Sequence, residues 1–532
     1  MAGMKKWGFI VLVILIVLGC RKEPIAWNID ALVPILKTKM TLQQAFPEEY
    51  ISVSNNNELQ ITYTGNLIKL KLDSALQVPD TTVSDTFSLP FGTITFPSGY
   101  EFLADSNYTR YNFGGAQLTH LFVSQGFLEF EIVSKIDGPT VFEYSFPTMK
   151  KNGVPLFIKE NVPGAVNGNP GTLSKSIDIS GYEIYLTGLN NDNFNVLASK
   201  YRAYIDSNSI PIVINAGDFF IASNTITQLQ PEYIRGSFGS EHSSQKETNE
   251  PLDIFDNVKS GFLTLEEASM DFTINNEAGM DLTVTVNEIS GWNSTNQTGV
   301  TLNSPLSNNS ININRATETN GIYSSPKSSA HITELNDENS NLTEFIANLP
   351  HALSYDFEID LNPLGNVSAG NDFIYNNTGV EINLDAEIPL NFNASNLVLI
   401  DTSDFEIDST SQEDVNQIIG GNLNIYSENW YPFDLFLQFY LLDDQNNIID
   451  SIFTQNAQIN GGIPIFGLVD DPQISLIKAP ISQEKANRLY QTVRIITKAR
   501  INSTSTENIR IFESYFLETK IVGDFEYQVA ID

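Results

Sequence analysis

The chain has 532 residues, of which 64 are acidic and 29 basic, so its formal net charge is −35 at pH 7. So acidic a surface repels phosphate backbones, which argues against nucleic acid as a partner. Hydrophobic residues make up 41% of the chain, enough to bury proper cores, and the length predicts three or four domains.

The first twenty residues have the pattern of an export signal. Lys5 and Lys6 precede an unbroken apolar run, residues 7–18, and the only cysteine of the chain, Cys20, follows closely. Spanning a bilayer as a helix needs about 20 apolar residues, so this run is too short to be a comfortable transmembrane anchor. A charged start before a run of this length is typical of a secretory signal peptide.

The stretch Val17-Leu18-Gly19-Cys20 resembles the lipobox of bacterial lipoproteins, although Leu18 departs from the residues usual at its position. The resemblance implies cleavage after residue 19 and several acyl chains on Cys20, which together anchor a protein stably. Arg21, where inner-membrane lipoproteins carry Asp, favours the outer membrane; the cell surface and the periplasmic face both stay open. The alternative is a plain signal peptide with a cysteine there by chance.

Apolar and polar residues alternate with period two along most of the mature chain. The clearest case is LSYDFEIDL, residues 353–361, and similar runs occupy 128–132, 282–286 and 380–384. Such runs are typical of antiparallel strands with one buried face, and glycine, proline and asparagine turn signals separate them. The pattern predicts an all-β fold of tandem β-sandwich, immunoglobulin-like domains.

Two short segments have helical signals instead. Residues 342–348 follow Ser340 and Asn341, either of which can cap a helix, and stop before a proline. Ser482 is the candidate cap of a second helix in SQEKANRLY. We expect both helices to connect strands.

A weak internal repeat guides the domain boundaries. Gly126, Gly261 and Gly421 each open a strand, a polar turn and a second strand, although any two β-hairpins look alike at this level. The predicted division is a signal peptide over 1–19, a lipid-anchored tether and lead-in over 20–46, a β-domain over 47–119, and sandwich domains over 120–256, 257–414 and 415–532. The polar stretch 236–250 is interpreted as a linker or a long loop.

Motifs for catalysis or metal binding are missing from the sequence. It contains no GxSxG, no HExxH and no phosphate-binding loop, and its four histidines stand far apart. Asp443, Asp444 and Asp450 offer oxygen ligands that Ca²⁺ prefers, but the EF-hand glycine and glutamate are missing, so a hairpin turn is the better interpretation. We expect no catalytic residue, no metal and no cofactor apart from the covalent lipid.

Three aromatic residues are possible glycan contacts. Trp292 lies in SGWNST, and Trp430 and Tyr431 lie in ENWYPF, each beside polar side chains that could bind sugar hydroxyls. The alternative is that these rings pin a core or a strand end, as aromatic residues in sandwiches usually do.

The mature chain resembles the large outer-membrane lipoproteins of Bacteroidota. The resemblance lies in AWNID soon after the lipobox, in DISGYEIYLTG (178–188) and in the block DLNPLGN…EINLDAEIPLNF (360–392). Proteins of this kind include glycan-binding partners of uptake porins and accessory subunits of β-barrel assembly or secretion complexes.

Together with the missing catalytic motifs, the resemblance implies a non-catalytic, lipid-anchored scaffold that binds an integral outer-membrane complex. The alternatives are a glycan-binding lipoprotein of a nutrient-uptake system and an undetected hydrolase.

Overall fold

A computed structural model describes residues 25–72, 80–88, 90, 92–256, 258, 260–322, 324–405, 416–465, 467–503 and 508–531. The signal peptide (1–19) and Cys20 lie outside the described residues, so cleavage and lipidation stay predictions. The described chain is all-β as predicted, with antiparallel sheets and two short α-helices. None of its helices combines the length and the apolar character needed to cross a bilayer.

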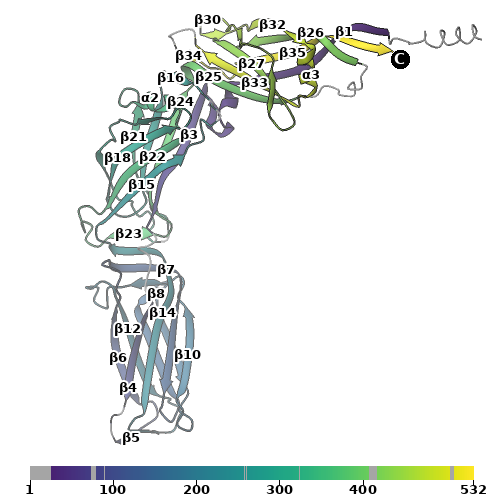
Figure 1. Cartoon of the computed structure of the whole chain (residues 1–532). Coiled ribbons are helices and arrows are strands. Elements are labelled where there is room, and N and C mark those ends of the chain that lie inside the picture. Colours follow the sequence, from purple (N-terminus) through teal and green to yellow (C-terminus); the bar gives the residue numbers. More distant parts are fainter. Residues whose placement is uncertain are drawn as a thin grey trace, which may run out of the picture.

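The sheets form three units that follow one another along a bent rod (Figure 1). We call them the proximal, middle and distal units. The described chain starts in the proximal unit and passes through the middle unit to the distal unit. On its return it enters the middle unit, adds residues 262–265 to a sheet of the proximal unit, completes the middle unit and then the proximal unit. Ile25 pairs with Ile531, so the two ends of the described chain lie together in the proximal unit.

The proximal unit combines a four-stranded sheet, β1-β35-β26-β32, with a seven-stranded sheet built on β16-β25-β33-β27-β28. Its elements are β1 (Ile25–Met40), β16 (Phe262–Leu265), β25 (Asn391–Asp404), β26 (Asn416–Asn429), β27 (Asp434–Leu442), β28 (Ile448–Ser451), β29 (Ala457–Ile459), β30 (Pro464–Ile465), β31 (Leu468–Val469), β32 (Gln473–Ser482), α3 (Gln483–Tyr490), β33 (Arg494–Asn502), β34 (Ile509–Arg510) and β35 (Leu517–Ile531). The predicted cap of α3 is confirmed, because Ser482 Oγ accepts a hydrogen bond from the amide of Lys485.

The middle unit is a sandwich of two five-stranded sheets, β15-β22-β18-β19 with β20, and β2-β3-β24-β17-β21. The short helix η1 (Leu42–Ala45) links the proximal unit to this sandwich and contacts β25. The elements of the middle unit are the short helix η2 (Glu48–Tyr50), with β2 (Ile51–Val53), β3 (Leu59–Lys71), β15 (Glu241–Pro251), β17 (Ser269–Asn276), β18 (Leu282–Asn293), β19 (Thr298–Thr301), β20 (Asn309–Ile313), β21 (Ser329–Asn336), α2 (Leu342–Ala347), β22 (Ala352–Leu361) and β24 (Gly379–Pro389). The run LSYDFEIDL lies within β22, and its apolar residues are buried as predicted. Across the sandwich, Phe357 of β22 meets Phe272 of β17 with ring centroids 6.0 Å apart.

The distal unit packs β9-β8-β12-β6 against β10-β7-β14-β4, and β11 joins the two sheets near the middle unit. Its elements are β4 (Thr81–Ser88), β5 (Thr93–Phe96), β6 (Glu101–Arg110), β7 (Gln117–Ser134), β8 (Thr140–Lys151), β9 (Val154–Val162), β10 (Gly171–Asp178), β11 (Glu183–Tyr185), β12 (Val196–Ile205), β13 (Ile212–Asn215) and β14 (Phe219–Ser237). Phe220 fills the core between the sheets, where its ring meets Phe102 and Phe142 at 5.6 and 5.9 Å.

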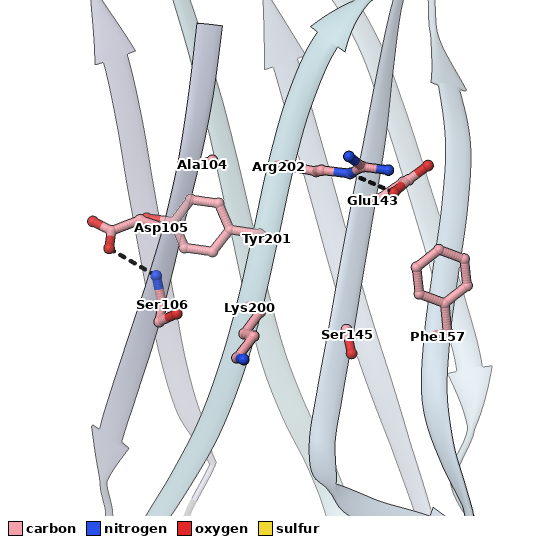
Figure 2. A pocket seen from close by; sticks show the side chains of 9 residues that line it. All are labelled: Ala104, Asp105, Ser106, Glu143, Ser145, Phe157, Lys200, Tyr201 and Arg202. Carbon is pink, nitrogen blue, oxygen red and sulfur yellow. Dashed lines mark hydrogen bonds and ion pairs between the residues drawn. The ribbon is translucent and has the colours of Figure 1, made fainter. Parts of the chain in front are cut away.

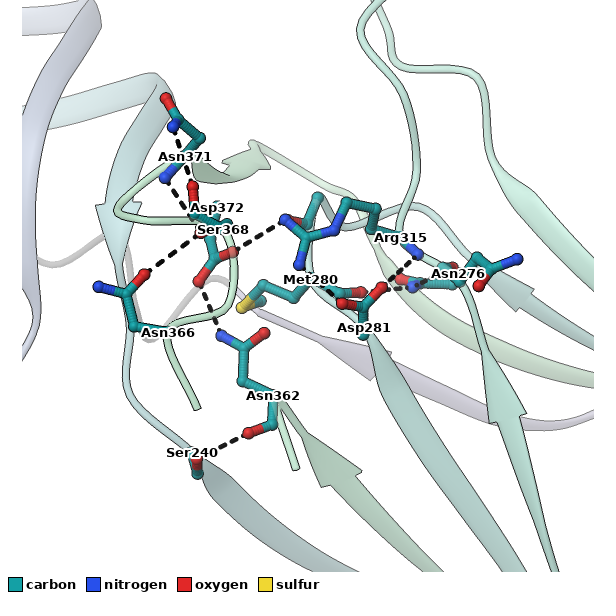
Figure 3. Close-up of polar contacts among 12 residues, drawn as sticks. Ser240, Asn276, Met280, Asp281, Arg315, Asn362, Asn366, Ser368, Asn371 and Asp372 are labelled. Atoms are coloured by element: carbon teal, nitrogen blue, oxygen red, sulfur yellow. Dashed lines mark hydrogen bonds and ion pairs between the residues drawn. The ribbon is translucent and has the colours of Figure 1, made fainter. Parts of the chain in front are cut away.

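An ionic cluster around one buried carboxylate lies at the junction of the middle and distal units (Figure 3). β23 (Asp372–Tyr375), from a loop of the middle unit, pairs with the end of β14. Asp372, which is fully buried, accepts hydrogen bonds from Arg315 at 3.1 Å and Asn362 at 2.8 Å, and Arg315 also pairs with Asp281 at 2.7 Å. These contacts tie three separate segments of the middle unit to the strand that continues the distal sheet.

The sheets join segments that the predicted domain boundaries separate. Residues 25–40, predicted as part of a lead-in over 20–46, form β1 and pair with β35 along its length. The boundary predicted at residue 120 falls inside β7, which runs from the distal unit into the junction. The predicted boundaries assumed that each domain is one continuous segment. Strands far apart in the chain can pair without any local signal in the sequence, so this assumption failed for β1 and β35.

The polar stretch 236–250 is largely a strand and not a linker or loop. Its residues 241–250 belong to β15, an edge strand that pairs with β22. Two cross-strand polar contacts take the place of apolar packing: Lys246 Nζ forms an ion pair with Asp356 at 2.6 Å, and His242 Nδ1 lies at hydrogen-bond distance, 2.8 Å, from Asp360. An edge strand can be wholly polar because only its backbone has to join the sheet.

Candidate functional site

An open groove on the outer face of the distal sheet β9-β8-β12-β6 is the candidate functional site (Figure 2). Its volume is about 440 Å³, and it is lined by Ala104, Asp105, Ser106, Glu143, Ser145, Phe157, Lys200, Tyr201 and Arg202. The register places Ser106, Lys200, Ser145 and Phe157 in one cross-strand row, one residue from each strand. The two serines of this row are short and alternate with the longer Lys200 and Phe157, so the surface is recessed at the serines.

A nearly buried carboxylate organises the groove. Glu143 accepts hydrogen bonds from Nε of Arg202 at 2.6 Å and from the hydroxyl of Tyr204 at 3.0 Å, and Lys159 Nζ lies 3.1 Å away. The hydrogen bond from Arg202 lowers the pKa of Glu143, and it also raises the pKa of Arg202 itself. Glu143 is therefore ionised at neutral pH and is a poor general acid, so its arrangement favours positioning of Arg202 over proton transfer.

Two aromatic rings complete this face. Phe157 is 58% exposed, whereas the residues on either side of it in β9, Leu156 and Ile158, are buried. Two cations lie near the ring of Tyr204, with Arg202 at 5.4 Å and Lys159 at 5.8 Å from its centroid. Arginine and aromatic side chains of this kind carry most of the binding energy in protein interfaces.

The opposite sheet of the distal unit has a different, hydroxyl-rich surface. Its depression is lined by Thr82, Glu129, Phe130, Glu131, Ser174, Lys175, Ser176, Ser223 and Thr225. Within the described parts of the chain, no group of three or more histidine, cysteine, aspartate or glutamate side chains could hold a metal ion. Of these two depressions of the distal unit, only the groove combines exposed cations with an exposed aromatic ring.

The three predicted glycan contacts do not form one site. Trp292 is on β18 of the middle unit, 38% exposed and packed over Gly299. Tyr431, in the proximal unit, is 1% exposed and stacks on Phe433 with centroids 5.2 Å apart, so its ring offers no face to a ligand. Its neighbour Trp430 is partly buried against a phenylalanine ring. Trp430 and Tyr431 therefore pack against the hydrophobic core of the proximal unit, which was the alternative to a glycan contact.

The acidic stretch at Asp443 forms the predicted hairpin turn, between β27 and β28. The carboxylate of Asp443 accepts hydrogen bonds from the amides of Gln445 and Asn447 at 2.9 and 2.8 Å. The hydrogen bond from the Asn447 amide lowers the pKa of Asp443. The carboxylate is thus a turn-forming group.

Sequence reasoning did not find the groove. Phe157, Arg202 and Glu143 lie on three different strands, and each of them occurs in an ordinary alternating run. The signal that was available is weak: in KYRAYI, residues 200–205, the outward positions carry two cations and a tyrosine. The order of the strands, which brings these residues together, is not encoded in any one segment.

No family model matches the sequence, and no curated protein matches it either. Among solved structures, the chain is similar to a protein from Parabacteroides distasonis described as secreted, with 11% identity, a TM-score of 0.26, and 96% of this chain and 100% of the other covered. It is also similar to the triple jelly-roll turret protein of an archaeal virus, with 9% identity, a TM-score of 0.12, and 85% and 90% covered. Because these TM-scores are so low, function has to be inferred from the chain's own geometry.

Proposed function

We propose that the protein is a non-catalytic outer-membrane lipoprotein, tethered by lipid on Cys20, whose distal unit binds an integral outer-membrane protein complex. The complex would be a β-barrel assembly, secretion or uptake machine. The observation that carries the proposal is the position of the groove. Both ends of the described chain meet in the proximal unit, and the groove lies in the unit at the other end of the rod (Figure 1).

The composition of the groove supports a protein partner. Protein interfaces are enriched in aromatic residues and arginine, with the strongest contributions from a few such residues near the centre. Here Arg202 is held in place by the buried Glu143, so little side-chain entropy remains to be lost on binding. Phe157 supplies an exposed apolar ring beside it.

Affinity purification of the tagged protein from gently solubilised membranes tests this proposal. We expect a barrel protein to be recovered in stoichiometric amount with the wild type and to be lost with the Phe157→Ser, Arg202→Ala double variant. The control is Ile210→Ala, which changes an aliphatic residue that is 81% exposed elsewhere in the distal unit. Recovery of the lipoprotein alone from wild-type membranes, or equal recovery with the double variant, would contradict the proposal.

A glycan-binding function is the second candidate, and Trp292 favours it. Its indole is the only one of the three predicted ring contacts with a substantial exposed surface, and Asn348 and Thr298 lie beside it on the same edge. Calorimetric titration with envelope and dietary polysaccharides would test it. Heat of binding that disappears in Trp292→Ala and persists in Phe157→Ser would favour this function over the first.

A further inference from the structure

A cleft lies between the middle and distal units, and we call it the junction cleft. Its volume is about 300 Å³, and residues of both units line it. Phe113 and Ala116 belong to the connection between β6 and β7 in the distal unit, whereas Glu241 and Leu361 belong to β15 and β22 of the middle unit. Apolar clefts of this size at the boundary between two domains are common sites for small ligands.

The inner wall of the junction cleft is apolar. Four of its lining residues are buried and have no charged or hydrogen-bonding side-chain group, namely Leu72, Met280, Leu361 and Ile374. The rings of Phe113 and Phe238 also line the cleft and are partly buried against the same core. Such a wall favours the hydrocarbon part of a ligand, because contact with it removes apolar surface from water.

One carboxylate completes the lining. Glu241 is exposed, and it is the only charged residue among the described residues that line the cleft. The basic residues of its own strand, His242 and Lys246, contact other carboxylates. Lys71 precedes the lining residue Leu72, but it is exposed where Leu72 is buried, so it projects from the opposite face of the chain.

The lining therefore selects for positive charge. A carboxylate attracts a cation directly, and aromatic rings such as those of Phe113 and Phe238 attract it through the negative charge on their faces. Arg315 of the neighbouring ionic cluster does not oppose this, because it is bonded to both Asp281 and Asp372. The net charge of −35 also favours the approach of a cation.

Buried asparagines hold both sides of the cleft in place. In the distal unit, Asn195 Nδ2 donates a hydrogen bond to the carbonyl of Ala116 at 2.7 Å. On the other side, Asn362 Nδ2 donates one to the carbonyl of Gly239 at 3.2 Å, and Figure 3 shows Asn362 beside Met280. Because these segments are already fixed, little conformational entropy remains to be lost when a ligand binds.

We propose that the junction cleft binds a small organic cation, a molecule with an apolar body and one ammonium group. The body would lie against Met280 and Leu361, and the ammonium group would lie beside Glu241. Since both units line the cleft, a bound molecule would contact both and stabilise their junction. The proposal goes beyond the proposed function, because the cleft is separate from the groove of the distal unit.

Three compounds with the same hydrocarbon chain test the proposed charge preference. They are hexylammonium, hexanol and hexanoate, added to the unacylated mature chain, residues 21–532, which includes every described residue. Titrations followed by ligand-observed NMR would measure the three affinities. We expect hexylammonium to bind at least about tenfold more tightly than hexanoate, with hexanol between them, because only the ammonium group gains from the carboxylate.

Two variants locate the binding in the cleft. Glu241→Gln is expected to remove the advantage of hexylammonium over hexanol and to leave the affinity for hexanol unchanged. Glu247→Gln is the matched control, because it changes an exposed glutamate of the same strand that does not line the cleft. Ala116→Leu is expected to weaken the binding of both compounds at least about tenfold, because the larger side chain occupies the cleft. Circular dichroism and thermal unfolding show whether each variant keeps its fold.

Hydrogen exchange tests the contact with both units. Hexylammonium is expected to slow the exchange of backbone amides in residues 111–118 of the distal unit and in residues 239–242 of β15 and the connection before it. Hexanoate at the same concentration is expected to leave both segments unchanged. Slower exchange in only one of the two segments would contradict a ligand that contacts both units.

Each remaining outcome also bears on the proposal. No saturable binding of hexylammonium, or equal affinities for hexylammonium and hexanoate, would overturn it. An ammonium preference that persists in Glu241→Gln would overturn it too, because the attraction would then come from the net charge of the chain. These assays use protein without its lipid or any partner, so their result is separate from the recovery of a barrel in the purification experiment.

Discussion

At the scale of single residues, His120 of β7 has the least ordinary environment of the four histidines. Its ring stacks on Tyr185 with centroids 4.3 Å apart, and Nε2 lies 3.5 Å from a carboxylate oxygen of Glu183. Burial lowers the pKa of His120 from 6.5 to about 4, although Glu183 opposes this, while Arg235 lowers it further. The folded protein therefore holds this imidazole neutral at pH values where the unfolded chain would protonate it.

The lowered pKa predicts a loss of stability in acid. Between pH 6.5 and about 4 the unfolded state binds a proton that the folded state does not, so the contribution of His120 is complete above pH 6.5 and falls toward pH 4. The loss amounts to about 3 kcal/mol. Denaturant unfolding at pH 7 and pH 4.5 should show a smaller acid loss in His120→Phe than in the wild type. The surface variant His331→Gln should behave like the wild type, and an identical loss in all three would refute the prediction.

Two adjacent glycines of β26 differ in what they tolerate. Gly421 has φ +139°, and a Cβ there would lie 2.2 Å from the carbonyl oxygen of Asp524 in β35. For Gly420 the nearest atom to such a Cβ is a carbonyl oxygen at 3.5 Å, an ordinary contact. Of the glycines that suggested the repeat, Gly261 has a similar steric reason, because its φ is +117° and a Cβ there would lie 2.6 Å from the backbone of Leu397.

Gly421→Ala is expected to destabilise the proximal unit by about 2–3 kcal/mol, because alanine would strain the backbone and collide with β35. Gly420→Ala should change stability by less than about 0.5 kcal/mol. Thermal unfolding of the two variants beside the wild type measures the difference. Equal melting temperatures for the two variants would contradict the prediction, because they would show that the backbone of β26 adjusts to the alanine without loss of stability.

At the scale of elements, the junction of the middle and distal units depends on backbone pairing and buried charge together. β23 extends the distal sheet by pairing with β14, and Asp372 at its start is neutralised by Arg315. The side chain of Asp372 is 1% exposed, so removal of Arg315 would leave a buried carboxyl group without its ion-pair partner. The junction thus tolerates loss of the arginine poorly.

Arg315→Ala is predicted to destabilise the junction by about 3–5 kcal/mol. Arg510→Ala, which removes the partner of Glu58 at 3.0 Å, is the control, because the Arg510 side chain is 57% exposed. Its cost should be at most about 1 kcal/mol. Hydrogen exchange of the β23 and β14 amides, followed by mass spectrometry, would compare the two. Faster exchange of β23 only in Arg315→Ala is expected, and equal rates in both variants would rule the explanation out.

At the scale of the whole molecule, the nested path of the chain builds a rod in which the two ends of the described chain, Ile25 and Ile531, lie together in the proximal unit. The proximal unit is made of residues 25–40, 262–265 and 391–531, and the middle unit combines residues 42–71 with strands from 241–389. The distal unit is formed by the part of the chain between residues 81 and 237, to which β23 adds one strand. The groove of the distal unit therefore lies at the other end of the rod from the paired residues Ile25 and Ile531 (Figure 1).

The rod shape predicts a large radius of gyration in solution. A compact domain of this length would have a radius of about 24 Å. Small-angle X-ray scattering of the mature chain should give a clearly larger value and an asymmetric distance distribution with a long tail. A radius near 24 Å would mean that the three units fold back on one another.

The sequence by itself determined the local structure. Period-two alternation placed β22 and buried Phe357, the cap at Ser482 placed α3, and the turn chemistry of Asp443 placed a hairpin, because these features depend on neighbours along the chain. Only the tertiary structure decided that β1 pairs with β35, that Tyr431 is buried and that Phe157 and Arg202 share a groove. The physical reason is that strand order and register arise from hydrogen bonds and packing between distant segments. The sequence of one segment alone does not determine which other segment it will pair with.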